Sequence, residues 1–518
     1  AIVVFVLLLV YHPITSVLVF PFLSVWFASP FIVWYISKPS DNKETGIAAE
    51  QSVYLRMLAR KTWSFFETFV VKEDNWLPPD NYQEQPVERI AHRTSPTNIG
   101  LSLLANLTAF DFGYITGREL IDLTDKTTST MLGMEKYRGH LYNWYDTQTI
   151  LPLTPRYIST VDSGNLVGHL ITLRQGILTI PDKKIVTEAM FEGLLDEGGI
   201  LLERTDIPEL KKFKEELKES YSLNLNSPLE LKTYLKSLED SLTKIFIQLD
   251  TDPETETEWW IQKLFNHIKN INSELTELVP WLNVPKAPEK FKDLIPALPG
   301  IPTMRQLSKI EQTLLNKVKS RLSSENSSDE NHWLEKFSTA IIGSGRLANE
   351  MILCAEQLAT RCAQLSDIDY DFLYDKSQHL LTIGYNTEDH RKDNSYYDLL
   401  ASEARLATFV AIAQGKLPQQ SWFALGRQLT HTGTTPVLLS WSGSMFEYLM
   451  PLLVMPTYKN TLLQQTMQAV IQKQIDYGKK RGVPWGVSES GYNRVDANLN
   501  YQYHAFGVPG LGFKRGLG

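Results

Sequence analysis

The N-terminal 37 residues contain no Asp, Glu, Lys or Arg, and this absence of charge constrains the chain more than any other feature. The apolar run from Ser16 to Ile36 approaches the roughly 20 residues that a helix needs to cross a bilayer. Pro21 and Pro30 are expected to kink this helix, and the stretch before it resembles the end of an earlier span. A signal peptide would have a basic start and a shorter apolar core, so residues 1–37 are predicted to be a membrane segment.

Length and composition bound the whole chain. Its 518 residues exceed what a single hydrophobic core usually spans, which favours two or three structural units. The net charge of −8 supplies no broad cationic field, so nucleic acid is not an expected partner. Cys354 and Cys362, the two cysteines, suit reduced buried thiols and a reducing compartment. Lys38 and Lys43 follow the apolar run and favour an exit on the cytoplasmic side.

The pattern beyond residue 37 is mainly helical. Leu55, Leu58, Phe65 and Phe69 fall on one helical face, and similar apolar helices alternate with aromatic loops along much of the chain. Between about residues 181 and 337, Lys and Glu alternate with Leu, which is typical of solvated helix surfaces and predicts an inserted helical subdomain. The alternation of helices and loops predicts a helical toroid. The predicted units are residues 1–37, 38–180, 181–337 and 338–518.

The sequence contains two partial binding motifs and lacks the usual zinc-binding motifs. The GxGxxA pattern from Gly343 to Ala348 would need a preceding strand to bind a dinucleotide, but its neighbours have helical spacing. Asp367, Asp369 and Asp371 begin like a calcium loop, yet Phe372 occupies the position that requires glycine. No HExxH motif and no paired cysteine ligands occur. We therefore expect no cofactor and no metal.

Glutamates within aromatic segments are the strongest chemical signal. Glu403 follows Tyr396-Tyr397-Asp398, Glu447 lies in Trp441-Ser-Gly-Ser-Met-Phe-Glu-Tyr, and Glu489 lies in Trp485-Gly-Val-Ser-Glu-Ser. Glycosyl transfer needs one carboxylic acid to protonate the departing oxygen and a second group to attack or to activate the acceptor. Aromatic faces can pack against sugar rings. Any one of these glutamates could instead begin a helix or pair with an arginine, but their shared context favours a site.

Four stretches resemble a known family, the glucoamylase-like region of cyclic β-1,2-glucan synthases. They are residues 92–114, 139–170, 396–413 and 483–493, and residues 440–451 and 503–518 strengthen the resemblance, which covers nearly all of residues 45–518. The resemblance implies an (α/α)6 toroid, truncated at its C-terminus, within a multi-pass protein of the bacterial inner membrane. In that family this region faces the cytoplasm, between a glucosyltransferase region and a phosphorylase-like region. It closes linear β-1,2-glucan into rings by retaining transglycosylation, without a nucleotide or a metal.

The same resemblance implies the site residues. Glu403 is the expected nucleophile and Glu489 the expected acid/base, with Glu447 as the reserve catalytic candidate. Four aspartates are expected to hold sugar hydroxyls or to position these carboxylates, namely Asp111, Asp146, Asp162 and Asp398. Six further residues are expected to contact the glucan, namely Arg93, Asn143, Trp144, Tyr145, Trp441 and Trp485.

Two other functions stay open at this stage. A hydrolytic β-glucanase on the same toroid could use the same carboxylates with water as the acceptor. A non-catalytic helical membrane scaffold could bind polysaccharide without cutting it.

Overall fold

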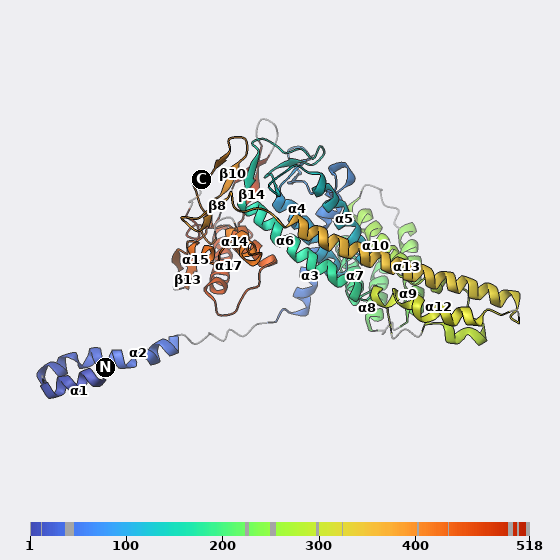
Figure 1. Ribbon diagram of the computed structural model, residues 1–518, viewed down its shortest axis with the longest axis horizontal. Coiled ribbons are helices and arrows are strands. Elements are labelled where there is room, and N and C mark those ends of the chain that lie inside the picture. Colours follow the sequence, from blue (N-terminus) through green and yellow to red (C-terminus); the bar gives the residue numbers. More distant parts are fainter. Residues whose placement is uncertain are drawn as a thin grey trace.

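A computed structural model describes most of the chain. The described residues are 2–11, 13–36, 46–222, 227–248, 255–296, 300–323, 325–400, 403–433, 435–495, 501–504 and 507–513. Within them the chain forms 17 α-helices, so the predicted mainly helical fold is confirmed (Figure 1). Closure of the helices into a toroid stays a prediction. The α-helices are α1 (Ile2–Tyr11), α2 (Pro13–Ile36), α3 (Ala49–Phe69), α4 (Pro96–Phe112), α5 (Gly117–Gly133), α6 (Thr160–Thr179), α7 (Glu188–Arg204), α8 (Pro208–Ser222), α9 (Pro228–Gln248), α10 (Glu256–Leu278), α11 (Met304–Leu307), α12 (Ile310–Arg321), α13 (Ser328–Leu365), α14 (Ala404–Ala413), α15 (Gln420–Ala424), α16 (Met445–Leu449) and α17 (Leu462–Arg481).

The strands are short and pair locally in small antiparallel ladders. Two pairings join more distant segments: β3 pairs with β6, and β7 pairs with β10 from the C-terminal half. The strands are β1 (Tyr82–Gln83), β2 (Arg89–Ile90), β3 (Arg93–Thr94), β4 (Lys136–Tyr137), β5 (His140–Leu141), β6 (Tyr145–Asp146), β7 (Tyr157–Ser159), β8 (Tyr374–Asp375), β9 (Leu380–Leu381), β10 (Gly384–Asn386), β11 (Arg391–Lys392), β12 (Leu429–Thr432), β13 (Thr435–Leu438), β14 (Ser490–Val495) and β15 (Tyr501–His504).

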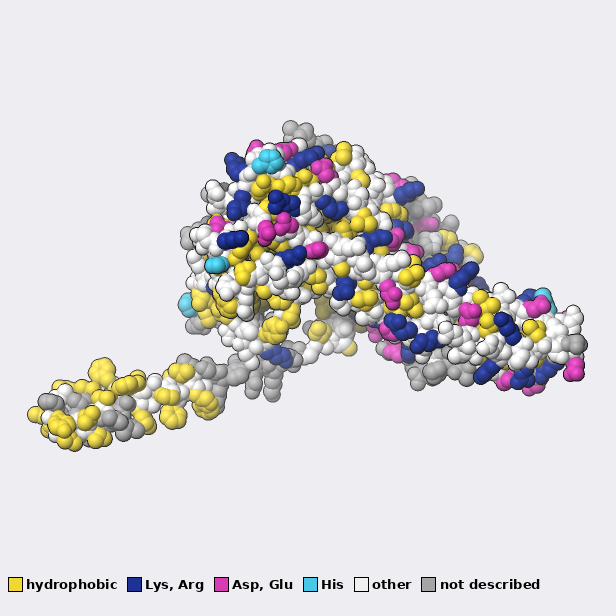
Figure 2. Space-filling view, in the orientation of Figure 1, with side chains coloured by type: hydrophobic (Ala, Val, Ile, Leu, Met, Phe, Trp, Pro, Cys, Tyr) yellow, Lys and Arg dark blue, Asp and Glu magenta, His cyan; other side chains and the backbone are white. Residues whose placement is uncertain are grey.

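Helix α2 carries the apolar N-terminal run. Its segment Val17–Tyr35 has 19 residues with a mean hydropathy of 2.0 and is 6% buried, so by length and composition it could cross a membrane. Figure 1 shows α1 and α2 apart from the main body, and Figure 2 shows their surface covered with hydrophobic side chains. The helix continues through Pro21 and Pro30. The predicted apolar helix is thus confirmed, whereas its topology stays a prediction.

Helix α6 is the centre of the main core. It packs against α4, α13 and α14. Between Asp162 and Arg174 it has no Asp, Glu, Lys or Arg, as expected of a helix that is covered on nearly every side. Gly164 lets α14 approach closely, because a Cβ atom there would lie 2.2 Å from the Cβ of Ala407. This contact fixes the start of α14 against the start of α6.

Helix α13 crosses the boundary predicted at residues 337 and 338. Its middle packs on α12, where a Cβ atom at Gly345 would lie 3.3 Å from Glu311. Its C-terminal part reaches α5, where Arg361 pairs with Asp125 at 2.8 Å. The GxGxxA pattern lies within α13, as its helical spacing predicted. The division into four units remains a prediction, although this helix is continuous across one of its borders.

A second, smaller core lies towards the C-terminus. It gathers apolar side chains from β13, α16 and α17 with Val508 and Leu511, and is distinct from the main core. Tyr448 joins these parts, because its hydroxyl shares one proton between the carbonyl oxygens of Leu438 and Leu511, at 2.9 and 2.8 Å. The segments that carry Glu447 and Glu489 are therefore held by this second core.

Replacement of Gly164 by alanine should lower the free energy of unfolding by about 1–3 kcal/mol, because the added methyl group would force α6 and α14 apart. Gly198→Ala in α7 is the matched control. No atom lies within 4 Å of a Cβ there, so this change should stabilise the helix by about 1 kcal/mol. Urea unfolding of both variants measures the difference. Equal stability of the two variants would contradict the close contact.

Candidate functional site

Glu403 lies immediately before α14 in the left-handed region of backbone conformation, with φ of 59°. This conformation is uncommon for a residue with a side chain, and it is found more often at functional sites. The side chain is 4% exposed, and its Oε1 atom has no hydrogen-bond partner within the described residues. A buried carboxyl oxygen without a partner is costly, so this group is available to a substrate.

Glu489 lies at the start of the β14–β15 hairpin. Its Oε2 atom accepts a hydrogen bond from the hydroxyl of Tyr503, which lies on the opposite strand. The ladder pairs Ser490 with His504, and this register brings Tyr503 beside Glu489. The structure thereby positions the second predicted catalytic carboxylate by a strand pairing.

The electrostatics of the two glutamates show that the structure brings them together. Burial raises the pKa of Glu403 well above its usual value, and the negative charges of Glu489, Asp162 and Glu447 raise it further. Burial also raises the pKa of Glu489, although the hydrogen bond from Tyr503 lowers it. A neighbouring carboxylate raises the pKa of a carboxyl group because the two negative charges repel each other. Four of the predicted site residues therefore form one carboxyl cluster, comprising Asp162, Glu403, Glu447 and Glu489.

Asp162 enters the cluster from the first turn of α6. Thr97 donates a hydrogen bond from Oγ1 to Asp162 Oδ1 at 2.5 Å, and Asn165 in turn donates to Thr97 at 3.1 Å. Burial raises the pKa of Asp162 despite these bonds. Since Thr97 lies in the first turn of α4, the two helices that carry this contact meet at the cluster.

Glu447 is held by its own loop. Its Oε2 accepts hydrogen bonds from the backbone N–H groups of Ser442 and Gly443 at 3.0 and 3.1 Å, and from Ser442 Oγ at 2.8 Å. The buried guanidinium of Arg405 donates to the carbonyl oxygen of Glu447 at 2.8 Å. Burial lowers the pKa of Arg405 to about 10, which still leaves it charged at neutral pH. These bonds suit a residue that positions the loop, and the reserve catalytic role of Glu447 stays a prediction.

Two exposed tryptophans lie on the same chain segments as two glutamates of the cluster. Trp441 is 50% exposed and Trp485 is 54% exposed, on the segments that carry Glu447 and Glu489 respectively. Their free faces could pack against sugar rings. Asp398 stabilises the turn before α14, since its Oδ1 accepts a hydrogen bond from the backbone N–H of Leu400 at 2.9 Å.

The predicted residues of the β3–β6 region form a separate polar and aromatic group. Arg93 pairs with Asp80 at 3.0 Å and lies over the ring of Trp144, 5.3 Å from its centre. The backbone N–H of Asn143 donates to the carbonyl oxygen of Tyr157 at 2.8 Å. Asp146 accepts hydrogen bonds from the backbone of Gln148 and Thr149, which closes a turn. Arg93, Asn143 and Trp144 remain partly exposed.

Two predicted residues lie elsewhere. Tyr145 has no exposed surface, and its hydroxyl donates a hydrogen bond to the carbonyl oxygen of Glu135, so it supports this loop from the core. Asp111 pairs with Lys183 at 2.8 Å near the end of α4. It lies 14 residues after Thr97 in that helix, which corresponds to about 21 Å. Neither side chain joins the carboxyl cluster.

The sequence interpretation missed Tyr503, Arg405 and the N–H groups of Ser442 and Gly443. Their roles depend on pairings that no sequence spacing reveals, namely the β14–β15 register and the packing of α14 against the loop that carries Glu447. No group of three or more His, Cys, Asp or Glu suited to a metal ion occurs within the described ranges.

No family model matches the chain. It is 35% identical over 511 residues to a cyclic beta-(1,2)-glucan synthase, NdvB, of Rhizobium meliloti (strain 1021). The match covers 96% of this chain and 16% of that protein, so the chain spans about a sixth of the length of its relative. The resemblance predicted from the sequence is confirmed by this similarity.

Two solved structures show a more distant likeness. An endo-beta-1,2-glucanase from Chitinophaga pinensis, in complex with sophorotriose and glucose, has a TM-score of 0.43 at 9% identity, over 90% of this chain and 76% of its own. A candidate glucoamylase from Bacteroides fragilis NCTC 9343 has a TM-score of 0.43 at 11% identity, over 90% of this chain and 75% of its own.

Glu403→Gln should stabilise the folded chain increasingly as pH rises. The folded pKa of Glu403 lies above its unfolded value, so the folded state retains a proton that the unfolded state releases above the ordinary glutamate pKa. The stability of the wild type should therefore decline as the pH rises from the ordinary glutamate pKa towards the pKa of folded Glu403. The neutral amide of glutamine removes that loss. Unfolding at pH 4 and pH 7.5 measures the change. The exposed Glu50→Gln is the control, and a benefit of Glu403→Gln that is equal at both pH values would contradict this account.

Proposed function

We propose that the chain is the part of a membrane cyclic β-1,2-glucan synthase that closes linear β-1,2-glucan into rings by retaining transglycosylation. The carboxyl cluster carries this proposal, because it supplies two glutamates with raised pKa values, the buried Glu403 and the partly buried Glu489. The similarity to a cyclic beta-(1,2)-glucan synthase supplies the substrate class. The proposed partners are β-1,2-glucan, the bacterial inner membrane, and the glucosyltransferase and phosphorylase-like regions of a longer protein.

The reaction takes two balanced steps in this proposal. Glu403 attacks the anomeric carbon and forms a glucosyl ester while the glycosidic bond breaks, and the departing oxygen takes a proton from Glu489. The distant 2-hydroxyl of the same glucan then attacks that carbon, its proton passes to Glu489, and the ester bond breaks. Ring closure requires that the sugar hydroxyl reaches the ester before water does. The exposed faces of Trp441 and Trp485 would hold the glucan there.

One observation favours the reverse assignment of roles. Glu403 is the more deeply buried of the two, and its pKa is raised further, so the unliganded site favours the protonated form of Glu403 over that of Glu489. A nucleophile must be ionised. With Glu403 as nucleophile, the positive charge that develops on the anomeric carbon must stabilise its ionised form once the sugar is bound.

Glu403→Gln and Glu489→Gln should each abolish ring formation from linear β-1,2-glucan and should retain glucan binding. Each change removes a carboxyl group of the pair while its shape is kept, so a loss of about 100-fold or more is expected. Mass spectrometry of the products identifies the rings, and a reducing-end assay follows hydrolysis. Gln472→Ala, at an exposed position on α17, is the control and should leave ring formation unchanged.

Each outcome of that assay separates the candidate functions. Ring product without an increase in reducing ends supports transglycosylation. Abundant new reducing ends without rings would identify a hydrolase. Full activity of both glutamine variants would exclude the pair and would favour a polysaccharide-binding scaffold with activity elsewhere.

Tyr503→Phe should shift the pH dependence of the reaction upward. The tyrosine hydroxyl donates to Glu489 and stabilises its ionised form, so loss of this bond raises the pKa of Glu489. If Glu489 donates the proton, activity should persist to higher pH in the variant than in the wild type. A pH–rate profile of both proteins measures the pH at which activity falls on the alkaline side. If this pH is unchanged or lower in the variant, the role of the hydrogen bond is contradicted.

A further inference from the structure

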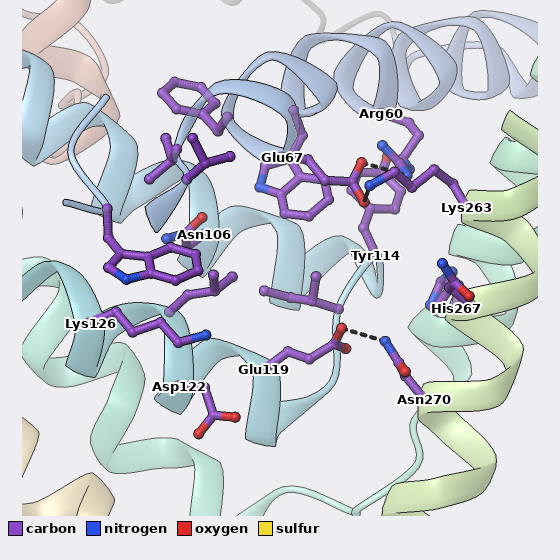
Figure 3. Close-up of a pocket in the computed structure, with 18 of the residues that line it drawn as sticks. Arg60, Glu67, Asn106, Tyr114, Glu119, Asp122, Lys126, Lys263, His267 and Asn270 are labelled. Atoms are coloured by element: carbon purple, nitrogen blue, oxygen red, sulfur yellow. Dashed lines mark hydrogen bonds and ion pairs between the residues drawn. The ribbon is translucent and has the colours of Figure 1, made fainter. Parts of the chain in front are cut away.

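A second site lies in a cavity of about 360 Å³ among α3, α4, α5 and α10. Figure 3 shows its lining, with Arg60 from α3, Asn106 from α4, Glu119 from α5 and Asn270 from α10. Cavities of this size are typical of sites for small molecules. No residue of the carboxyl cluster lines it.

Three residues of the lining, Arg60, Trp63 and His267, carry a buried polar atom without a partner among the described residues. Arg60 is 1% exposed and its Nε donates to Glu197 Oε1 at 2.7 Å, yet its Nη1 has no hydrogen-bond partner among the described residues. The same holds for Nε1 of Trp63 and for Nε2 of His267, whose Nδ1 lies 3.0 Å from Glu197 Oε2. Buried polar atoms are nearly always paired, so these three residues keep unused hydrogen-bonding capacity beside the cavity.

The charge of the lining indicates a neutral ligand. Three cationic side chains and four carboxylates line the cavity, and several already pair with one another. Glu67 accepts ion pairs from Arg60 at 3.2 Å and from Lys263 at 3.0 Å. The buried pair of Arg60 and Glu197 is likewise satisfied at 2.7 Å. An anion would meet an excess of carboxylates, and a cation would meet Arg60 and Lys263, so neither is favoured.

Aromatic faces complete the lining. Trp63 and Trp76 both border the cavity. Trp76 has φ of 59°, and Lys126 lies 4.3 Å from the centre of its ring. Thr127 fixes its backbone by donating a hydrogen bond to its carbonyl oxygen at 3.0 Å. Together with the amides of Asn106, Asn266 and Asn270, these rings match the two surfaces of a sugar, its apolar face and its hydroxyl groups.

We infer that this cavity is a carbohydrate-binding site, separate from the carboxyl cluster, that holds a glucosyl unit of a neutral oligosaccharide. A sugar hydroxyl both donates and accepts hydrogen bonds, so it can satisfy Arg60, Trp63 and His267 alike. The choice of β-1,2-linked glucose rests on the proposed function, whereas the sugar class rests on the cavity itself.

The two sites are separated along α4. Thr97, which contacts Asp162 in the cluster, precedes Asn106 by nine residues, or about 14 Å of helix. A single glucosyl unit in the cavity is therefore separate from the carboxyl cluster. Retention of one glucan at two points raises its local concentration at each site. In this proposal the chain binds its glucan at two sites.

The trisaccharide of β-1,2-linked glucose tests the inference by calorimetric titration. The Glu489→Gln chain is used, so that the titration measures binding alone. We expect two classes of site. Trp63→Phe in this background keeps an aromatic ring but removes the N–H donor, so one class should weaken about tenfold while the other is unchanged. Trp259→Phe, on α10 but outside the cavity lining, is the matched control and should change neither class.

A second variant separates a loss of binding from a loss of folding. Asp122→Asn changes an exposed residue at the cavity and should weaken the same class of site without lowering the thermal midpoint. One class of site that is unaffected by Trp63→Phe and by Asp122→Asn would overturn the inference. Inorganic phosphate that binds at the cavity in place of the trisaccharide would overturn it as well. Since no turnover is required, the result stands whether or not the ring-forming assay succeeds.

Discussion

The burial of several carboxyl groups at one point is the constraint on which the site depends. Ionised carboxylates are costly to bury together, because each loses hydration and repels the others. Four carboxyl groups nevertheless come together here, those of Asp162, Glu403, Glu447 and Glu489. Hydrogen bonds from neighbouring groups offset part of the cost. Thr97 donates to Asp162, Tyr503 donates to Glu489, and the loop N–H groups surround Glu447. Glu403 keeps a buried oxygen, Oε1, without a hydrogen bond in the described structure.

The scaffold explains how such a costly arrangement is held. Gly164 brings α6 against α14, and this contact fixes the residue from which Glu403 projects. Arg405, the second residue of α14, then donates hydrogen bonds to the carbonyl oxygens of Glu447 and Tyr448. The main core and the smaller C-terminal core thus meet at the cluster, with one glutamate supplied by each side of the junction. A change in either core should alter the separation of Glu403 and Glu489.

The sequence predicted the parts of this molecule that local patterns determine. The absence of charge before Lys38 predicted the apolar helix, and apolar spacing predicted the helical body. The aromatic context of Glu403 and Glu489 predicted residues that the structure brings together. Contacts between distant segments could not be predicted in this way. Tyr503 needed the hairpin register, and the network of Arg60, Glu197 and His267 needed α3, α7 and α10 to meet. Tyr145 and Asp111 carry suitable side chains, but burial and helix length place them away from the cluster.

The most direct test of the central claim is covalent trapping. A β-1,2-gluco-oligosaccharyl fluoride has a leaving group that needs little acid catalysis, so the Glu489→Gln chain should form the glucosyl ester and resolve it slowly. Peptide mapping by mass spectrometry should then find the sugar on the peptide that contains Glu403. Attachment to the peptide that contains Glu489, in the Glu403→Gln chain, would reverse the two roles. The absence of an ester in both variants would contradict a retaining reaction at this pair.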